Sequence, residues 1–152
     1  MGLSDDIALV ILAEKVNGTK PAKVFTGGNE TGALIHIAGM GDMGNGKTGP
    51  QKWDKITRGA TNRVDSADAK WIYFDFDEPG AADVTELEGI SGPGDSGGPA
   101  FMIINGEKYV CGISSHQKGA DRAGRGRYGV TECYSRVSSY AEWIAMHMKS
   151  FE

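Results

Sequence analysis

The segment Gly92-Pro-Gly-Asp-Ser-Gly-Gly-Pro99 holds Ser96 between glycines. Gly94, Ser96 and Gly98 match the Gly-x-Ser-x-Gly nucleophile elbow, but that elbow must lead directly into a helix. Here the chain continues into residues 100–104, which are apolar and strand-like. A serine flanked by glycines can still be a nucleophile, because the backbone N–H groups of Gly94 and Ser96 can point together at a developing oxyanion. Taken alone, the segment is most simply a tight turn.

Composition limits what surrounds this turn. The 152 residues suffice for one core, and 20 acidic against 16 basic residues give a net charge of −4. Without a block of Lys or Arg, nucleic-acid and membrane-surface roles have no electrostatic support. The longest apolar run is too short to span a bilayer, and the chain start lacks the basic residues of a secretory signal. The two cysteines, Cys111 and Cys133, cannot form a zinc site alone, and either a cross-strand disulfide or two buried thiols fits.

Hydrophobic patterning predicts an all-β chain closed by one helix. The 23 glycines are spread along the sequence and favour many turns. Ile104-Asn-Gly-Glu107 is a hairpin signal, and Ser139-Tyr-Ala-Glu142 fits a capping box that would begin the C-terminal helix. The predicted strands are residues 6–13, 33–38, 55–65, 71–77, 100–104, 108–114 and 128–137.

Residues 39–48 read GMGDMGNGKT and match two nucleotide-binding patterns. Gly41, Gly46, Lys47 and Thr48 fit the P-loop pattern, and three of the glycines fit the dinucleotide pattern. A P-loop needs a helix that starts at its Gly-Lys-Thr, because the helix amides hold the phosphate. A Gly-Pro pair follows Thr48 instead, without a clear helical stripe. A P-loop nucleotide binder is therefore the weaker alternative, and a glycine-rich loop is favoured.

Five segments, taken together and in chain order, give the sequence a family resemblance. The chain resembles the trypsin-like (chymotrypsin-fold) serine peptidases, whose nucleophile motif it contains letter for letter. The other matches are the region around the triad aspartate, a glycine-flanked turn, the strand beside the substrate, and the closing strand with the terminal helix. The matching segments are residues 94–99, 6–12, 38–41, 111–115 and 134–144.

The resemblance implies a catalytic role for several residues. Ser96 would be the nucleophile and Asp6 the buried carboxylate that orients the general base. The backbone amides of Gly94 and Ser96 would form the oxyanion hole, and Ser115 would be a hydrogen-bond partner of Asp6. Asp95 would pair with the amino terminus that is released on activation. Acyl transfer needs a nucleophile, a base, its orienting group and an oxyanion hole.

One member of the family's constellation is absent from its expected place. The general base should be a histidine that precedes Asp6, and only five residues precede it here. His36, His116 and His147 do not occupy the position of that base. Either an upstream segment or a second chain supplies the histidine, or the protein is a catalytically inactive homologue that acts as a protein-binding module. Because Asp6, Gly94 and Ser96 are all present, we expect the first alternative, in which this chain is truncated and lacks the segment with the histidine.

The same resemblance suggests an organisation and a class of partner. Residues 1–24 would be the tail of a first β-barrel with its connector, residues 25–138 a second Greek-key β-barrel, and residues 139–152 a C-terminal helix. A protein or peptide would be the substrate, with no cofactor, metal, nucleic acid or membrane involved. Family habit also implies secretion, although the chain shows no signal peptide.

The residues expected around the substrate pocket disagree about specificity. By family position, Ile90 and Ser91 line the base of the primary pocket, which suggests an apolar or small substrate side chain. Glu132, if it faces the same pocket, argues for a basic side chain instead. His116 and Gln117 replace an aromatic residue and a glycine that are usual at the pocket's edge, which puts ordinary subsite geometry in doubt.

Overall fold

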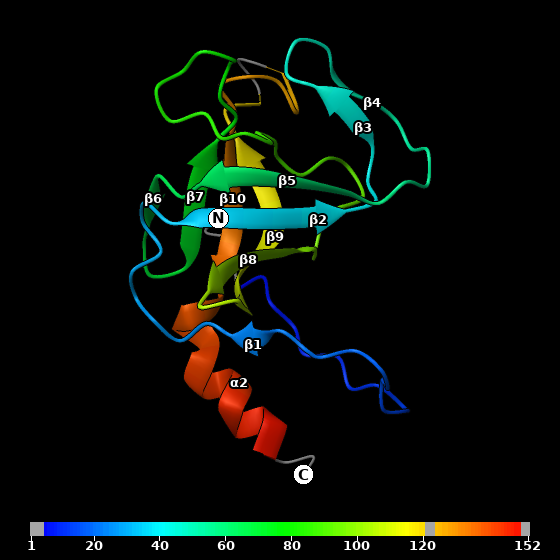
Figure 1. Ribbon diagram of the computed structural model, residues 1–152, viewed down its shortest axis with the longest axis vertical. Coiled ribbons are helices and arrows are strands. Elements are labelled where there is room, and N and C mark those ends of the chain that lie inside the picture. The colour runs from blue at the N-terminus through cyan, green and yellow to red at the C-terminus, as the bar shows by residue number, and fades with distance from the viewer. Residues whose placement is uncertain (1–4, 121–123, 150–152) are drawn as a thin grey trace.

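A computed structural model describes residues 5–120 and 124–149 of the chain. One curled, mainly antiparallel sheet forms a half-barrel, with strand order β5-β2-β8-β9-β10-β7-β6 and β1 paired in parallel with β9 (Figure 1). The predicted mainly β fold with a C-terminal helix is confirmed. The sheet strands are β1 (Lys23–Val24), β2 (Leu34–Gly39), β5 (Arg58–Arg63), β6 (Ser66–Ala67), β7 (Trp71–Asp75), β8 (Pro99–Ile104), β9 (Glu107–Lys118) and β10 (Thr131–Arg136).

The smaller elements lie at the two ends of this sheet in Figure 1. Strands β3 (Met43–Asn45) and β4 (Gly49–Lys52) form a separate two-stranded hairpin. A 3₁₀ turn, η1 (Val137–Tyr140), follows β10 and leads into the helix α2 (Ala141–Met148). The predicted division into a first-barrel tail (residues 1–24), a second barrel (residues 25–138) and a helix stays a prediction. Strand β1 lies in the first of these parts but pairs with β9 of the main sheet.

The hairpin between β8 and β9 follows directly from its sequence. Asn105 and Gly106 both have positive φ, at 51° and 77°, as a two-residue type I′ turn requires. Asn and Gly adopt that conformation more easily than other residues, and the turn matches the twist of the flanking strands. The predicted hairpin is confirmed, with Ile104 paired to Glu107.

The core fills the inside of the curled sheet with alternating residues of several strands. Ile35 on β2, Phe74 on β7 and Tyr134 on β10 are buried there, and successive side chains of a strand point to opposite faces. Cys111 and Cys133 are both buried free thiols, so the structure contains no bridge between them. Burial raises the pKa of Cys111 to about 12 and that of Cys133 to about 11, which keeps both thiols protonated and unreactive.

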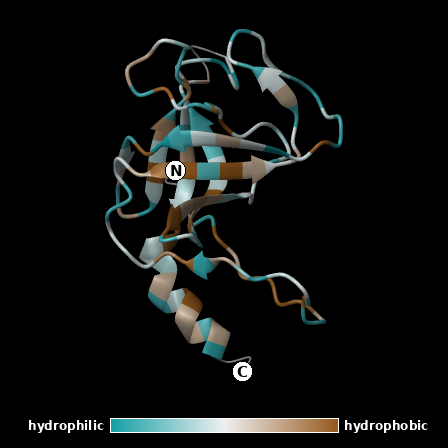
Figure 2. Cartoon of the chain, viewed as in Figure 1, coloured by the Kyte–Doolittle hydropathy of each residue, from teal (hydrophilic) through white to brown (hydrophobic). Residues whose placement is uncertain are grey.

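The predicted buried strand at residues 6–13 is wrong. The segment has no regular secondary structure and pairs with no strand among the described residues, and Val10 is 81% exposed. Figure 2 shows hydrophobic residues along this arm, outside the half-barrel. A strand needs a neighbouring ladder to satisfy its backbone, and an apolar run without one remains irregular. Side-chain and backbone bonds at Asp6 tie the arm to β9 and β10.

The predicted start of the C-terminal helix also needs correction. Helix α2 begins at Ala141, and its N-cap, Tyr140, makes no side-chain capping bond. The four residues from Val137 form the 3₁₀ turn first, so Ser139 lies inside η1 and cannot cap α2. Two strand predictions were also too long at both ends: residues 55–65 contain only β5, and residues 128–137 contain only β10.

A buried ion pair joins the segment after β1 to the end of β10. The Arg136 guanidinium donates to both carboxylate oxygens of Glu30, at 3.0 and 2.7 Å, and Ser138 Oγ donates a third bond. Glu30 is fully buried. Burial alone would raise the pKa of Glu30, but the hydrogen bonds from Arg136 and Ser138 outweigh burial and leave that pKa lowered.

Replacing Glu30 with alanine is expected to lower the free energy of unfolding by about 3 kcal/mol, because the partly buried Arg136 loses its carboxylate. Because the folded-state pKa of Glu30 is depressed, its contribution is present above the ordinary carboxyl pKa and is lost as pH falls through the folded value. Urea unfolding at pH 7 checks this. Glu107→Ala, which removes an exposed pair with Lys20, is the control and should change stability little.

Candidate active site

Ser96 lies at the tip of a tight turn that leads into β8. Gly94 and Gly97 have φ values of +97° and +81°, a region that side chains disfavour, so the glycines around the serine are required by the backbone. Gly97 N–H donates to the carbonyl of Ser114 at 2.9 Å, and Ser114 N–H donates back to Gly98 at 2.9 Å. These bonds hold the turn against β9 and leave the Ser96 side chain exposed.

The backbone amides beside Ser96 are available to a ligand. Within the described part of the chain, the N–H groups of Gly94 and Ser96 donate to no protein acceptor, and both residues are exposed. Their neighbour Asp95, by contrast, donates its N–H to Gly92 at 3.0 Å. An oxyanion hole needs donors of this kind next to the nucleophile, aimed together at the developing oxyanion. Their role as the oxyanion hole stays a prediction.

The Asp95 side chain ties this turn to the chain after β2. Its carboxylate accepts the backbone N–H of Gly41 at 2.6 Å and that of Gly92 at 2.9 Å. A Cβ on Gly41 would lie 2.7 Å from the Asp95 carboxyl carbon, and a Cβ on Gly39 would also collide with this carboxyl group. The Gly-Met-Gly sequence therefore makes room for Asp95. Sequence reasoning noted both motifs but missed this contact between them.

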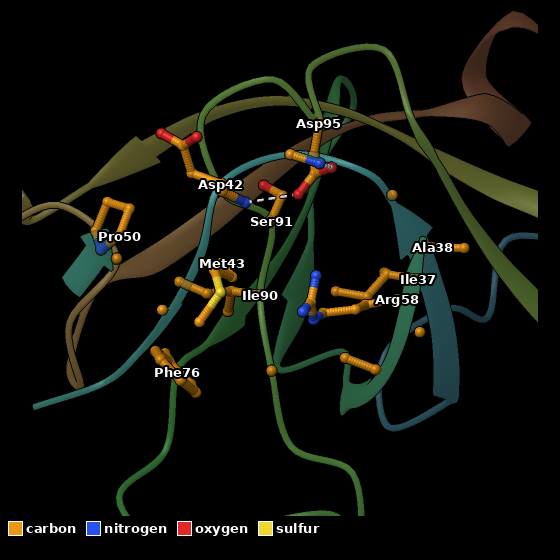
Figure 3. A pocket seen from close by; sticks show the side chains of 18 of the residues that line it. Ile37, Ala38, Asp42, Met43, Pro50, Arg58, Phe76, Ile90, Ser91 and Asp95 are labelled. Atoms are coloured by element: carbon orange, nitrogen blue, oxygen red, sulfur yellow. Dashed lines mark hydrogen bonds between the residues drawn. The ribbon is translucent and has the colours of Figure 1, made fainter. Parts of the chain in front are cut away.

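A cavity of about 260 Å³ opens beside Asp95 (Figure 3). Most of its wall is apolar, and Figure 3 shows Met43, Phe76 and Ile90 around it, with the Asp95 carboxylate at one end. Ile90, which was expected at the base of the substrate pocket, lies on the wall of this cavity. Asp42, Arg58 and Glu88 also line the cavity, so its apolar wall is bordered by charged groups of both signs.

Asp6 and Ser115 are brought together, as the family resemblance implied, but Asp6 is exposed and the expectation that it is buried is wrong. Ser115 Oγ donates to Asp6 Oδ2 at 2.6 Å, and Ser135 Oγ donates to the Asp6 carbonyl at 2.6 Å. His116 continues this chain of contacts, with Nδ1 at 3.1 Å from Ser115 Oγ and its ring edge against Trp71. Partial burial, and then the positive charge of Lys118, lower the pKa of His116. That Asp6 orients a catalytic base stays a prediction.

The other two histidines have structural partners. His36 stacks on Phe101, and the His147 ring contacts Trp143 within α2. Neither forms a hydrogen bond with the Ser96 turn in the described residues, and neither does His116. The described chain therefore presents the serine and its amides without a histidine hydrogen-bonded to the serine.

Glu132 on β10 is a buried carboxylate with neutral partners. It is fully buried, and it accepts Ser91 Oγ at 2.8 Å and Gln117 Nε2 at 2.6 Å. The three predicted pocket residues Ser91, Gln117 and Glu132 thus meet in one cluster, named here the Glu132 cluster. Burial raises the pKa of Glu132 to about 7, although the two hydrogen bonds lower it and nearby Asp95 raises it further. Among the described residues, no Lys, Arg or His forms an ion pair with Glu132.

Replacing Glu132 with glutamine is expected to stabilise the protein at pH 8 by about 2–3 kcal/mol. Because the folded-state pKa of Glu132 is raised, the folded protein holds a proton that the unfolded chain releases above about pH 4.3. Stability is therefore lost as pH rises toward 7, and a neutral amide avoids this loss. Urea unfolding of both proteins at pH 5 and pH 8 checks the prediction. A difference that is equal at both pH values would contradict it.

The glycine-rich stretch that suggested a P-loop forms the β3–β4 hairpin. Thr48 N–H donates to the Asn45 carbonyl at 3.2 Å, and the chain then enters β4 rather than a helix. The phosphate-binding pattern therefore lacks the helix N-terminus that it requires. Within residues 5–120 and 124–149, no group of three or more His, Cys, Asp or Glu side chains could hold a metal ion. In the same residues, no helix has the length and apolar character needed to cross a membrane.

A comparison of the sequence with protein-family models agrees with this geometry. The family model described as Trypsin matches residues 2–144, which is nearly the whole chain. The match contains Asp6, the Ser96 turn, the Glu132 cluster and the first residues of α2.

Proposed function

Because the chain belongs to the trypsin family, we propose that it carries the nucleophile of a serine endopeptidase, which hydrolyses peptide bonds through an acyl-enzyme on Ser96. The observation that carries this proposal is an exposed Ser96 whose own backbone N–H, like that of Gly94, is unused. A turn that served only the fold would have no need to leave both amides free beside a hydroxyl. The tie from Asp95 to Gly41 and Gly92 supports the same reading, since it fixes the turn in place.

In the proposed reaction, Ser96 Oγ attacks the carbonyl carbon of the scissile bond, and its proton passes to the general base. The carbonyl oxygen becomes an oxyanion that accepts the N–H groups of Gly94 and Ser96. The C–N bond then breaks as the base returns the proton to the leaving amine. Water attacks the resulting ester by the same route, which releases the acid and restores Ser96.

The base is proposed to be a histidine that a further polypeptide segment supplies. Its Nδ1–H would donate a hydrogen bond to Asp6, whose Oδ2 already accepts Ser115 Oγ at 2.6 Å. A carboxylate in that position keeps an imidazole in the productive tautomer. The alternative, an inactive homologue that only binds proteins, rests on the lack of a histidine hydrogen-bonded to the serine in the described residues.

The apolar cavity beside Asp95 is proposed to receive a free amino terminus. The carboxylate would pair with the α-ammonium group, and the first side chain would fill the space among Met43, Phe76 and Ile90 (Figure 3). Such a pair would fasten Asp95, and with it the Ser96 turn, in the active arrangement. Cleavage of a precursor chain would create that terminus.

Glu132 is proposed to set a preference for Lys or Arg before the scissile bond. A buried carboxylate without a cationic partner is costly, and a substrate cation would compensate it. Ser91 Oγ donates to this carboxylate, although Ser91 and Ile90 both line the cavity beside Asp95.

Peptide p-nitroanilides test the proposed function, with protein expressed from the complete gene. Substrates that end in Lys or Arg should be hydrolysed, at rates well above those that end in Leu, Ala or Glu. Failure to hydrolyse any of them, in protein whose fold is confirmed by circular dichroism, would favour the inactive homologue.

A further inference from the structure

The Gln117 side chain connects three parts of the chain around the Glu132 cluster. Its Nε2 donates to Glu132 Oε1 at 2.6 Å and to the Ser91 carbonyl at 3.3 Å. Its Oε1 accepts the backbone N–H of Gly126 at 3.0 Å. One carboxamide thus joins β10, the segment before the Ser96 turn and the loop before β10. Both ends of the amide are satisfied, so this conformation of Gln117 is specifically held.

Glu132, the partner of the Gln117 amide, is the carboxylate that a basic substrate side chain would need. Glu132 has two carboxylate oxygens: Ser91 Oγ occupies one and Gln117 Nε2 the other. Both are neutral donors, while hydrogen bonds between charged groups are stronger than those from neutral donors. A substrate ammonium or guanidinium would have to reach the oxygen that Gln117 now holds.

The backbone allows the amide to leave without disturbing the sheet. Gln117 lies directly opposite Glu132 in the antiparallel pair of β9 and β10. Gln117 is half-buried near the end of β9, and rotation about its side-chain bonds would free the carboxylate while the ladder stays intact. Rotation would also leave the Gly126 N–H, in the loop before β10, without its acceptor on Gln117.

We propose that Gln117 is an internal plug of the primary substrate pocket, whose carboxamide occupies the place of the substrate's cationic group on Glu132. The proposal rests on the proposed function, in which Glu132 recognises a basic side chain. Binding a cation then requires Gln117 to swing out and give up its three hydrogen bonds. The protein exists mainly in a closed form, and its apparent affinity for a cation is reduced by the small fraction that is open.

Benzamidine, a small aromatic amidinium, is the probe for this plug. Its affinity is measured by titration calorimetry at pH 8, where Glu132 is mostly charged, in the full chain carrying Ser96→Ala. Gln117→Ala should bind benzamidine about 10- to 100-fold more tightly. This gain is expected if only a few per cent of the parent protein is open and the substitution opens all of it. Gln117→Met, which keeps the length of the side chain without its amide, guards against a folding defect. Gln51→Ala, at an exposed glutamine on β4, is the matched control and should bind as the parent does.

A second substitution shows whether the gain depends on the carboxylate. In a Glu132→Gln background, Gln117→Ala should give little or no gain, because the amidinium has no anion to meet. Equal affinity with and without Gln117, no measurable binding by Gln117→Ala, or a gain that persists without Glu132 would each overturn the plug.

The binding test does not depend on catalysis. Tight binding by Gln117→Ala in a protein that hydrolyses no peptide would support the plug and contradict the proposed peptidase. Hydrolysis after Lys or Arg without any effect of Gln117 would do the reverse.

Discussion

Replacing Ser96 with alanine should lower kcat/KM for peptide hydrolysis by about 10⁴- to 10⁶-fold and leave the fold unchanged. The hydroxyl is the proposed nucleophile, so its loss removes the acyl-enzyme route altogether. Ser96 is exposed, and its hydroxyl forms no hydrogen bond to any described residue, so the free energy of unfolding should change by less than about 0.5 kcal/mol. Steady-state kinetics on a Lys or Arg p-nitroanilide and urea unfolding of the same preparation check both statements.

Ser139→Ala is the matched control for this substitution. Ser139 is also an exposed serine, but it lies in η1 beside the C-terminal helix. Its replacement should leave kcat/KM unchanged. Activity in Ser96→Ala close to that of the parent would rule out Ser96 as the nucleophile.

Replacing Asp95 with asparagine should lower kcat/KM by about 10²- to 10³-fold, the effect of losing one oxyanion-hole donor. The carboxylate accepts two backbone N–H groups, from Gly41 and Gly92, and an amide can accept only on its oxygen. The Asp95 side chain would lose one of its two hydrogen bonds, and the amides of the Ser96 turn would be held less firmly. The loss should lie mainly in kcat, because the amides act on the transition state. Unfolding should become easier by about 1–3 kcal/mol, the penalty of an unsatisfied polar group.

Two further variants show whether the effect of Asp95 comes from these contacts. Gly41→Ala should reproduce the loss of activity, since a Cβ there would meet the Asp95 carboxyl carbon at 2.7 Å. Asp42→Asn changes another carboxylate of the same cavity and should have little effect on kcat. Equal losses in Asp42→Asn and Asp95→Asn would contradict a specific role for Asp95.

Local sequence chemistry predicted the parts of the fold that depend on local geometry. The Asn-Gly hairpin after β8 and the glycines around Ser96 follow from backbone conformations that few other residues adopt. The arm at residues 6–13 was mispredicted because a strand depends on its neighbours, and no apolar run reveals whether a neighbour is present. The helix start was misplaced because the capping pattern does not distinguish an α-helix from a preceding 3₁₀ turn.

The candidate site was only partly visible in the sequence. The contact between Asp6 and Ser115, residues far apart in the chain, was anticipated through family position and is present at 2.6 Å. The link from Gln117 to Glu132 was missed, because it depends on the register of β9 against β10. Once two strands are known to pair, opposite residues can be read from their register. The position of Ile90 on the wall of the cavity beside Asp95 also depends on tertiary packing.

Covalent labelling shows whether Ser96 is the nucleophile of a trypsin-family serine peptidase. Protein expressed from the complete gene is treated with a fluorophosphonate, and the modified residue is located by mass spectrometry. We expect one adduct per chain, on Ser96, that is absent in Ser96→Ala and is reduced by a competing Lys or Arg peptide substrate. A folded preparation that remains unlabelled at Ser96 would rule out Ser96 as the nucleophile.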